Sequence, residues 1–391
     1  MKVARRIESL PPYLFAELDR KIAEKRADGV DVISLGIGDP DLPTPPHIVA
    51  ALRDAATDPT AHRYPSYHGL PAFREAVAAF YARRFGVSLD PEAEVLPLIG
   101  SKEGLAHLSF AFVDEGDRAL VPDPGYPVYA TSTVLAGGEV VPMPLTQERG
   151  FLPDLGALEV PPRTKLMWLG YPNNPTAAVA DLAFLEGATA FARRNDLLLC
   201  HDAAYSEITF DGYVAPSVLE VPGARDVAVE FGSLSKTYNM TGWRVGYVVG
   251  NREAIRALGA LKTNLDSGVF NAIQRAAVEA LNGPQDCVER MRAIYQRRRD
   301  TVVSALQEVG IAQEPPMGSI YVWVRTPEGR TSEAFAEELL EEAGVVVAPG
   351  TGYGPNGQGF VRISLTVSDA RLAEATGRIR ERLASARVST T

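Results

Sequence analysis

The sequence has little cysteine, no long apolar run and no excess of basic residues, and each shortage narrows what the protein can be. The only cysteines among the 391 residues are Cys200 and Cys287, with no Cys-x-x-Cys pair, which is too few for a disulfide framework and fits a reducing compartment. The apolar stretches are only of strand length, which argues against a membrane-spanning helix, and the first residues lack the apolar core of a signal peptide. We therefore expect a cytoplasmic protein without a membrane partner.

The charge balance excludes a second class of partner. The formal net charge is -10, with basic residues mixed among acidic ones, whereas a nucleic-acid surface needs a concentrated positive patch. At 46% hydrophobic and 23% charged residues, the composition is ordinary for a soluble globular protein with room for two or three domain-sized units. Small-molecule chemistry is therefore the expected function, with no nucleic acid involved.

Short apolar runs alternate with helical patterns from about Glu94 onward. This alternation predicts βαβ units that build a largely parallel sheet, and runs without polar residues indicate strands covered by helices on both faces. An amphipathic helix is predicted over residues 69–85. The predicted strands of the sheet span residues 95–99, 118–122, 138–143, 165–170, 197–202, 226–231 and 244–250. We therefore predict an α/β fold with a seven-stranded, mostly parallel sheet.

The pattern changes after residues 283–284. A basic helix over 288–306 precedes a strand at 319–325, a helix at 331–344 and strands at 345–349 and 359–365, which predicts a smaller α+β domain. The N-terminal segment, with a predicted helix at 11–29, is too short to form its own core and is expected to join that domain. The predicted division is an N-terminal segment 1–45, a large domain 46–284 and a small domain 285–391.

Lys236 ends a serine-rich stretch, Ser233-Leu234-Ser235-Lys236, between two predicted strands. A lysine desolvated in a crevice at a strand end has a lowered pKa, and its free amine can form a Schiff base with a carbonyl compound. Ser233, Ser235 and Arg244 offer hydroxyls and a guanidinium to a phosphate monoester. Taken alone, the stretch also fits a solvated loop lysine. It also spells the Ser-x-x-Lys of penicillin-binding enzymes, but their Ser-Asp-Asn and Lys-Thr-Gly motifs do not occur.

Three further patterns bear on ligand chemistry. The segment Gly100-Ser101-Lys102 follows a predicted strand and opens a helix, so its backbone N–H groups and the helix dipole predict a phosphate site. Residues 352–357 spell the dinucleotide fingerprint but lead into a strand and not a helix, so no nicotinamide cofactor is expected. No metal is expected either, because no metal-ligand spacing occurs among the histidines, His47, His62, His68, His107 and His201.

Five motifs occur in the order found in one enzyme family. They are Tyr171-Pro-Asn-Asn174-Pro-Thr, His201-Asp202-Ala-Ala-Tyr205, Ser233-Leu-Ser-Lys236, Gly242-Trp-Arg244 and Phe360-Val-Arg362-Ile-Ser. Over essentially its whole length the chain resembles a fold-type I aminotransferase of class I and II, of the aspartate aminotransferase superfamily. The resemblance implies pyridoxal 5'-phosphate held on the catalytic Lys236, an amino acid and a 2-oxo acid as substrates in ping-pong turnover, and a homodimer with shared active sites.

The resemblance also assigns residues to the cofactor. Asp202 would keep the pyridine nitrogen protonated, while Asn174 and Tyr205 would hydrogen-bond the phenolic oxygen. Tyr126 would stack on the ring, and Tyr64 would reach the phosphate of the partner subunit. As isolated residues, Asp202 also fits a helix cap, Asn174 a turn and Tyr126 a core position. The remaining cofactor residues implied are Ser101, Lys102, Ser233, Ser235, Lys236 and Arg244.

Arg362 resembles the residue that clamps the substrate α-carboxylate through a bidentate pair, and substrate closure would then bring the domains together. As an isolated arginine between Val361 and Ile363, it also fits the polar face of a surface strand. Lys102 suits a distal carboxylate and equally an exposed first helical turn. The other substrate residues that the resemblance implies are Tyr13, Gly38, Asn174 and Asn271, with Asn271 coming from the partner subunit.

Several phrases resemble one group within the superfamily. LPPYLFAELDR, SLSKTYNMTGWRVG and GTGYGPNGQGFVRIS are similar to LL-diaminopimelate aminotransferases, which exchange an amino group between LL-diaminopimelate and 2-oxoglutarate in lysine biosynthesis. An aspartate, alanine, N-succinyl-diaminopimelate or broad-specificity aminotransferase would share every cofactor residue, so these substrates stay open. A fold-type I lyase or decarboxylase is the rival from another reaction class, and a cofactor-binding sensor without catalysis is a further one.

Overall fold

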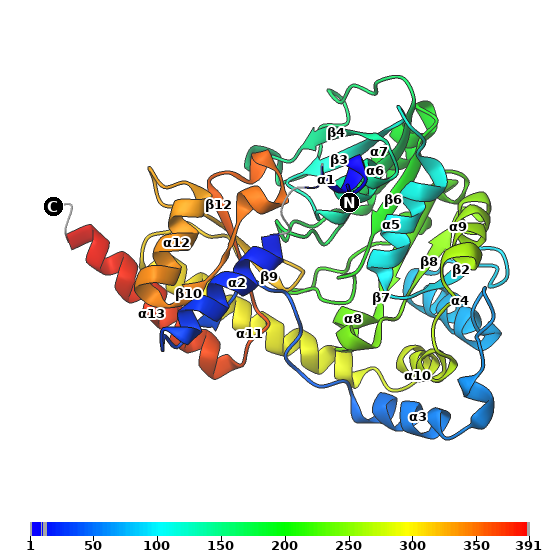
Figure 1. Ribbon diagram of the computed structural model, residues 1–391, viewed down its shortest axis with the longest axis horizontal. Coiled ribbons are helices and arrows are strands. Elements are labelled where there is room, and N and C mark those ends of the chain that lie inside the picture. The colour runs from blue at the N-terminus through cyan, green and yellow to red at the C-terminus, as the bar shows by residue number, and fades with distance from the viewer. Residues whose placement is uncertain (1, 9, 11–13, 389–391) are drawn as a thin grey trace.

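A seven-stranded sheet forms the larger part of the protein (Figure 1). The computed structural model describes residues 2–8, 10 and 14–388. The strand order is β2-β8-β7-β6-β5-β3-β4, and β8 alone runs against its neighbours in this sheet. The predicted α/β class and mostly parallel sheet are confirmed. The strands are β2 (Val95–Leu98), β3 (Arg118–Asp123), β4 (Glu139–Pro144), β5 (Thr164–Leu169), β6 (Leu198–Asp202), β7 (Ala228–Ser233) and β8 (Gly246–Gly250).

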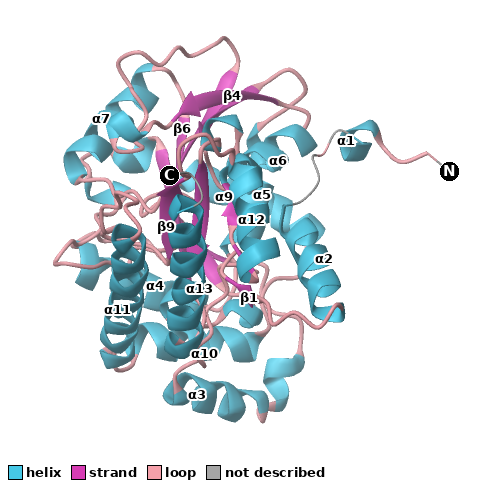
Figure 2. Cartoon of the chain, turned by 90° about the vertical axis from the view of Figure 1, so that its left-hand side faces the viewer, coloured by secondary structure: helices cyan, strands magenta, loops and turns pink. Residues whose placement is uncertain are grey.

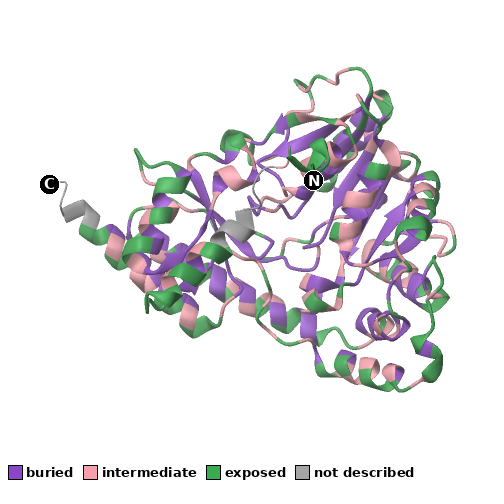
Figure 3. Cartoon of the chain, viewed as in Figure 1, coloured by how far each residue is buried: buried purple, intermediate pink, exposed green. Residues whose placement is uncertain are grey.

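Helices cover both faces of this sheet (Figure 2). Successive strand residues point to opposite faces, so Met167 packs in one core with α4, α7 and α10, while Trp168 packs in another with α5, α6 and α9. Both side chains are fully buried, which explains the absence of polar alternation in these strands. Buried residues occupy most of the central strands of the sheet (Figure 3). The helices are α3 (Pro46–Ala56), α4 (Pro71–Phe85), α5 (Ser101–Phe112), α6 (Val128–Leu135), α7 (Leu182–Arg194), α8 (Leu234–Thr237), α9 (Arg252–Leu265) and α10 (Asn271–Asn282).

A three-stranded antiparallel sheet, in the order β11-β12-β9, lies beside the large one, and the long helix α11 runs between the two parts (Figure 1). The prediction of a single strand at 345–349 is wrong. It divides at Val347 because its halves hydrogen-bond to different neighbours, β10 to β1 and β11 to β12. The elements are α11 (Asp286–Glu308), β9 (Tyr321–Arg325), α12 (Ser332–Ala343), β10 (Val345–Val346), β11 (Ala348–Pro349), β12 (Phe360–Ser364) and α13 (Asp369–Val388).

The N-terminal segment contains α1 (Arg5–Glu8), α2 (Leu14–Ala27) and β1 (Ile33–Ser34). Its strand β1 pairs in parallel with β10, so the beginning of the chain hydrogen-bonds to a segment more than three hundred residues later. The domain boundaries after residues 45 and 284 stay a prediction. Within the described ranges, every helix is too short or too polar to cross a bilayer.

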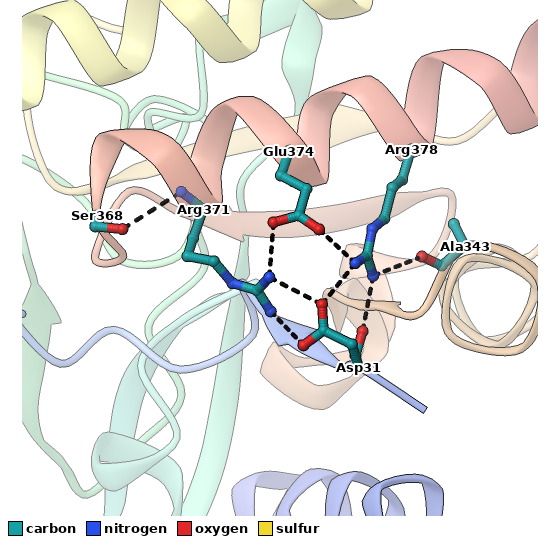
Figure 4. Close-up of polar contacts among 6 residues, drawn as sticks. All are labelled: Asp31, Ala343, Ser368, Arg371, Glu374 and Arg378. Carbon is teal, nitrogen blue, oxygen red and sulfur yellow. Dashed lines mark hydrogen bonds and ion pairs between the residues drawn. The ribbon is translucent and has the colours of Figure 1, made fainter. Parts of the chain in front are cut away.

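A charge network joins the N-terminal segment to α13 (Figure 4). The carboxylate of Asp31 contacts Arg371 and Arg378, each at 2.7 Å, and Glu374 bridges the same two arginines. Arg378 also donates a hydrogen bond to the backbone oxygen of Asp31 at 2.7 Å. Hydrogen bonds from Arg371 and Arg378 lower the pKa of Asp31 to about 2. The network therefore fixes the start of β1 against the C-terminal helix.

We expect Asp31→Asn to lower the Tm at pH 7 by about 1–3 °C, because networks of exposed charges stabilise only modestly. The pKa of Asp31 is lower in the folded state than in the unfolded state. Its stabilisation is therefore present above about pH 4 and declines as the pH falls toward 2. Thermal unfolding should show a smaller difference between wild type and variant at pH 3 than at pH 7.

The matched control is Glu253→Gln, which removes an exposed pair between Glu253 and Arg256 within α9. It joins no distant segments and should lower the Tm less than Asp31→Asn does. An Asp31→Asn effect that is equal at both pH values would contradict the assigned network.

Candidate active site

A cavity of about 300 Å³ lies at the edge of the large sheet where β3, β5, β6 and β7 end. Parallel strands bring the residues that follow them to one edge, which is why side chains distant in sequence meet there. Three lining residues had no predicted role, namely Asp19, Ile37 and Tyr321. The residues predicted from the sequence that line it are Gly38, Ser101, Tyr126, Asn174, Asp202, Tyr205, Lys236 and Arg362.

Lys236 lies in α8, a single turn of helix directly after β7, where a loop was expected. The Ser233 side chain caps this turn by accepting a hydrogen bond from the Ser235 N–H at 3.2 Å. The Lys236 ammonium donates to the backbone oxygen of Gly38 at 2.7 Å. Burial lowers the pKa of Lys236, so a larger fraction of free amine is present at neutral pH than for a surface lysine.

Asp202 is the last residue of β6, and its side chain is buried. Tyr129 donates a hydrogen bond to Oδ2 at 2.8 Å, and the Ala204 N–H approaches Oδ1 at 3.3 Å. Burial raises the pKa of Asp202 against the effect of these donors. The preceding His201 pairs with Glu230 at 2.9 Å. Asp202 therefore presents a desolvated carboxyl to the cavity at a strand end and does not cap a helix.

Arg362 is 1% exposed on β12, so its interpretation as a surface arginine is wrong. It donates to Asn174 Oδ1 at 2.8 Å and to the backbone oxygen of Gly36 at 2.7 Å. Its guanidinium carbon lies 3.9 Å from the centre of the Tyr321 ring, and the Tyr321 hydroxyl lies 3.2 Å from that of Tyr205. The cavity is thus lined by a guanidinium, an amine and two tyrosines, from Arg362, Lys236, Tyr205 and Tyr321.

The turn between β2 and α5 approaches the Arg244 guanidinium closely. Gly100 has φ of 74°, and a Cβ on it would lie 2.3 Å from Arg244 Nη2. A Cβ on Gly246 would lie 2.9 Å from the Ser101 backbone nitrogen. Glycine at both positions therefore keeps open a niche that combines a guanidinium with N–H groups at the start of a twelve-residue helix. Such a combination favours an anion with several oxygens, such as a phosphate monoester.

Several residues with predicted roles lie apart from the lining of this cavity. Lys102 is exposed in the first turn of α5. Tyr64 is 87% exposed, and Asn271 is buried at the start of α10, with its amide 3.5 Å from the Arg63 backbone oxygen. Tyr13 falls outside the described residues. The roles of these four residues stay predictions.

Tyr321 was missed because it occurs inside an apolar strand and resembles a core residue. Only the register reveals it: Tyr321 is opposite Ser364, which shares a face of β12 with Arg362. Asp19 belongs to an amphipathic helix, and Ile37 to a glycine-rich loop. Neither position carries a sequence signal that would have distinguished it from its neighbours.

One acidic group elsewhere resembles a metal site. Among the described residues, ligand atoms of Glu103, His107 and Asp266 lie within 4.8 Å of one another. The buried ammonium of Lys262 contacts Glu103 at 3.0 Å and Asp266 at 2.9 Å. A cation thus already balances the two carboxylates, and we assign no metal to the group.

Comparison with known proteins agrees with the geometry. Residues 30–379 match the family described as aminotransferase class I and II. The LL-diaminopimelate aminotransferase of Desulforudis audaxviator is 58% identical over 379 residues, which cover 96% of this chain and 97% of the relative. The apo-BacF structure from Bacillus subtilis superposes with a TM-score of 0.93 at 42% identity, covering 97% of this chain and 98% of that chain.

A probable N-succinyldiaminopimelate aminotransferase from Thermus thermophilus is also similar in structure. Its TM-score is 0.89 at 40% identity, and the match covers 94% of this chain and all of that one. The similarity extends over both sheets, and the enzyme class and the fold predicted from the sequence motifs are confirmed. The chain therefore belongs to the class I and II aminotransferases.

Proposed function

We propose that this aminotransferase binds pyridoxal 5'-phosphate on Lys236 and exchanges an amino group between LL-diaminopimelate and 2-oxoglutarate in lysine biosynthesis. The observation that carries the cofactor assignment is the desolvated amine of Lys236 in one cavity with Asp202, Asn174 and Tyr205. The substrate assignment is supported by relatives named LL-diaminopimelate aminotransferase at 52–58% identity. An aspartate, alanine, N-succinyl-diaminopimelate or broad-specificity enzyme is the alternative.

The residues fit the phosphate of this cofactor. The Arg244 guanidinium and the Ser101 N–H approach the glycine turn, and Ser235 is buried in the capped turn that carries Lys236. The phosphate monoester is a dianion, so it gains from the guanidinium and from the positive end of α5 together. We infer that Ser101, Ser233, Ser235 and Arg244 hold it, while Tyr126, which also lines the cavity, covers the ring.

Pyridoxal phosphate, when bound, supplies an aldehyde that condenses with amines and a protonated ring that withdraws electrons from the bond being broken. Asp202 would suit the ring nitrogen because its carboxyl is buried, where a positive charge beside it is favourable. Tyr129 keeps the carboxylate in place by its hydrogen bond to Oδ2. Asn174 and Tyr205 are then available to the phenolic oxygen.

Lys236 would serve as the proton carrier. Because burial lowers its pKa, Lys236 is suited to accept the proton of the substrate α-carbon when its amine is free. Its hydrogen bond to the Gly38 oxygen holds it on the side of the cavity that faces the N-terminal segment. The same side chain can hold that proton and release it again, so one residue would act as base and acid.

Arg362 suits the α-carboxylate that every amino-acid and oxo-acid substrate carries. Asn174 and Gly36 each accept one of its hydrogen bonds, and these fix the plane of the guanidinium before substrate arrives. Position 38 has room only for glycine, since a Cβ there would lie 2.0 Å from the Tyr321 hydroxyl. The distal end of the substrate is assigned to Tyr13, Lys102 and Asn271 by resemblance alone.

We also propose a homodimer with shared sites. Tyr64 lies among other exposed apolar side chains, Tyr67, Leu265 and Phe270, which are 51%, 60% and 39% exposed. Their two segments are in contact, since the rings of His62 and Phe270 lie 5.9 Å apart. An exposed apolar patch of this kind is typical of a protein interface.

A substrate screen tests the proposed reaction. With 2-oxoglutarate as acceptor, we expect kcat/KM for LL-diaminopimelate to exceed that for aspartate, alanine and aromatic donors by about 10²-fold. Glutamate formation is the measurement. Equal rates with all donors would support the broad-specificity alternative, and pyruvate or carbon dioxide in place of glutamate would indicate a lyase.

Lys236→Ala tests the catalytic assignment. We expect the variant to retain cofactor without a covalent bond and to lose turnover by about 10⁴-fold or more, because the proton carrier is gone. Borohydride reduction followed by mass spectrometry should add the cofactor mass to wild type and not to the variant. Lys165→Ala, which removes an exposed lysine on β5, is the control and should behave as wild type. Near-normal turnover of Lys236→Ala would refute the assignment.

Tyr64→Phe tests the shared site. Sedimentation should show twice the chain mass of 42.1 kDa for both wild type and variant. The variant should bind pyridoxal phosphate about 10-fold more weakly, because one hydrogen bond to the phosphate is lost. Tyr67→Phe changes the same surface and should leave the affinity unchanged. A monomeric wild type, or equal affinities in all three proteins, would contradict the proposal.

A further inference from the structure

The glycine-rich loop between β11 and β12, which contains the dinucleotide fingerprint, contacts the large sheet. It forms two short turns, η6 (Gly350–Tyr353) and η7 (Pro355–Gly357). The Asn356 side chain donates a hydrogen bond to Asp123 Oδ2 at 2.9 Å, and the Asn356 backbone N–H donates to Oδ1 at 3.1 Å. Asp123 is the last residue of β3. One carboxylate of the large sheet therefore accepts two hydrogen bonds from a loop of the small sheet.

The loop packs closely against this carboxylate. Asp123 is only 8% exposed, so the two hydrogen bonds from Asn356 supply donors that a buried carboxylate requires. A Cβ on Gly354, where φ is 133°, would lie 2.1 Å from Asp123 Oδ1. The Gly125 N–H donates to the Tyr353 backbone oxygen at 2.8 Å. We call Asp123, Gly125, Tyr353 and Asn356 the latch, because their hydrogen bonds join two segments that are distant in sequence.

Each segment of the latch leads to a residue of the candidate site. Tyr126 follows Gly125 directly and lines the cavity. Arg362 also lines the cavity, and it lies on β12, the strand that the loop enters. The guanidinium carbon of Arg362 lies 4.9 Å from the centre of the Tyr353 ring. The latch therefore joins the turn that carries Tyr126 to the loop that packs against Arg362.

We propose that Asp123 and Asn356 are positioning residues that set the separation of Tyr126 and Arg362. The inference rests on the proposed function, in which Tyr126 covers the cofactor ring and Arg362 binds the substrate α-carboxylate. A substrate held at Arg362 while it reacts at the ring needs both groups at a fixed separation. Tyr126 is also held between β3 and α6, so loss of the latch would loosen the Arg362 side and leave the cofactor site intact.

Asn356→Asp tests this role, because it keeps the shape of the side chain and places a second carboxylate against Asp123. We expect KM for LL-diaminopimelate and KM for glutamate to rise by the same factor, about 10-fold, since both substrates bring an α-carboxylate to Arg362. The affinity for pyridoxal phosphate and the absorbance of the bound cofactor should stay as in wild type. Equal losses of cofactor affinity and substrate affinity would indicate general damage to the fold and would overturn the proposal.

Exchange of the two residues tests the contact itself. In the double variant Asp123→Asn with Asn356→Asp, an amide again faces a carboxylate, so both KM values should return to within about 3-fold of wild type. Thr351→Ala is the matched control, because it removes a hydrogen bond from the same loop to Glu333 on α12 and not to β3. It should leave both KM values unchanged. A double variant no better than Asn356→Asp alone would overturn the proposal.

A second measurement needs neither cofactor nor substrate. Amide hydrogen exchange in the apoprotein should be faster in Asn356→Asp than in wild type, both at residues 119–131 and at residues 350–362, and slow again in the double variant. Unchanged exchange in these two segments would overturn the inference. If wild type transaminates neither LL-diaminopimelate nor glutamate, the proposed function fails, and the exchange measurement still decides whether the latch joins the two segments.

Discussion

Two hydrogen bonds hold one loop between the sheets, and the rest of the site depends on them. Lys236, at the end of β7, donates to the Gly38 oxygen, and Arg362, on β12, donates to the Gly36 oxygen. The loop after β1 is thus held by an amine from the large sheet and a guanidinium from the small one. Because both donors lie away from bulk water, each bond is stronger than it would be in water.

The sequence was sufficient to locate most of this site, because parallel strands bring the polar residues that follow them to one edge of the sheet. Asn174 follows β5, Asp202 ends β6 and Lys236 follows β7, so knowing that the strands run in parallel already places the three together. The order of the motifs then identified the family. The helix predicted at 331–344 is also found, and α12 lies within a residue of these bounds.

Other features depend on which strands pair with each other, which a single sequence does not reveal. The division of residues 345–349 into β10 and β11 depends on two different partners, β1 and β12, each distant in sequence. Tyr321 became visible only through its register with β12. Lys102, Tyr64 and Asn271 were assigned by resemblance, and nothing within one chain brings them to the cavity lining. Contributions from a partner subunit cannot be inferred from periodicity, because periodicity describes only the packing of the chain on itself.

Burial favours the neutral form of both Asp202 and Lys236, although it shifts their pKa values in opposite directions. The pKa of the carboxyl rises and that of the amine falls, since each charged form loses its hydration. A protonated ring nitrogen beside Asp202 would lower the pKa of that carboxyl again, because the two charges would form an ion pair. Condensation of the Lys236 amine with an aldehyde would leave that amine unable to titrate. A ligand with a protonated ring would thus offset the desolvation of the Asp202 carboxylate, because the two opposite charges would pair in the buried pocket.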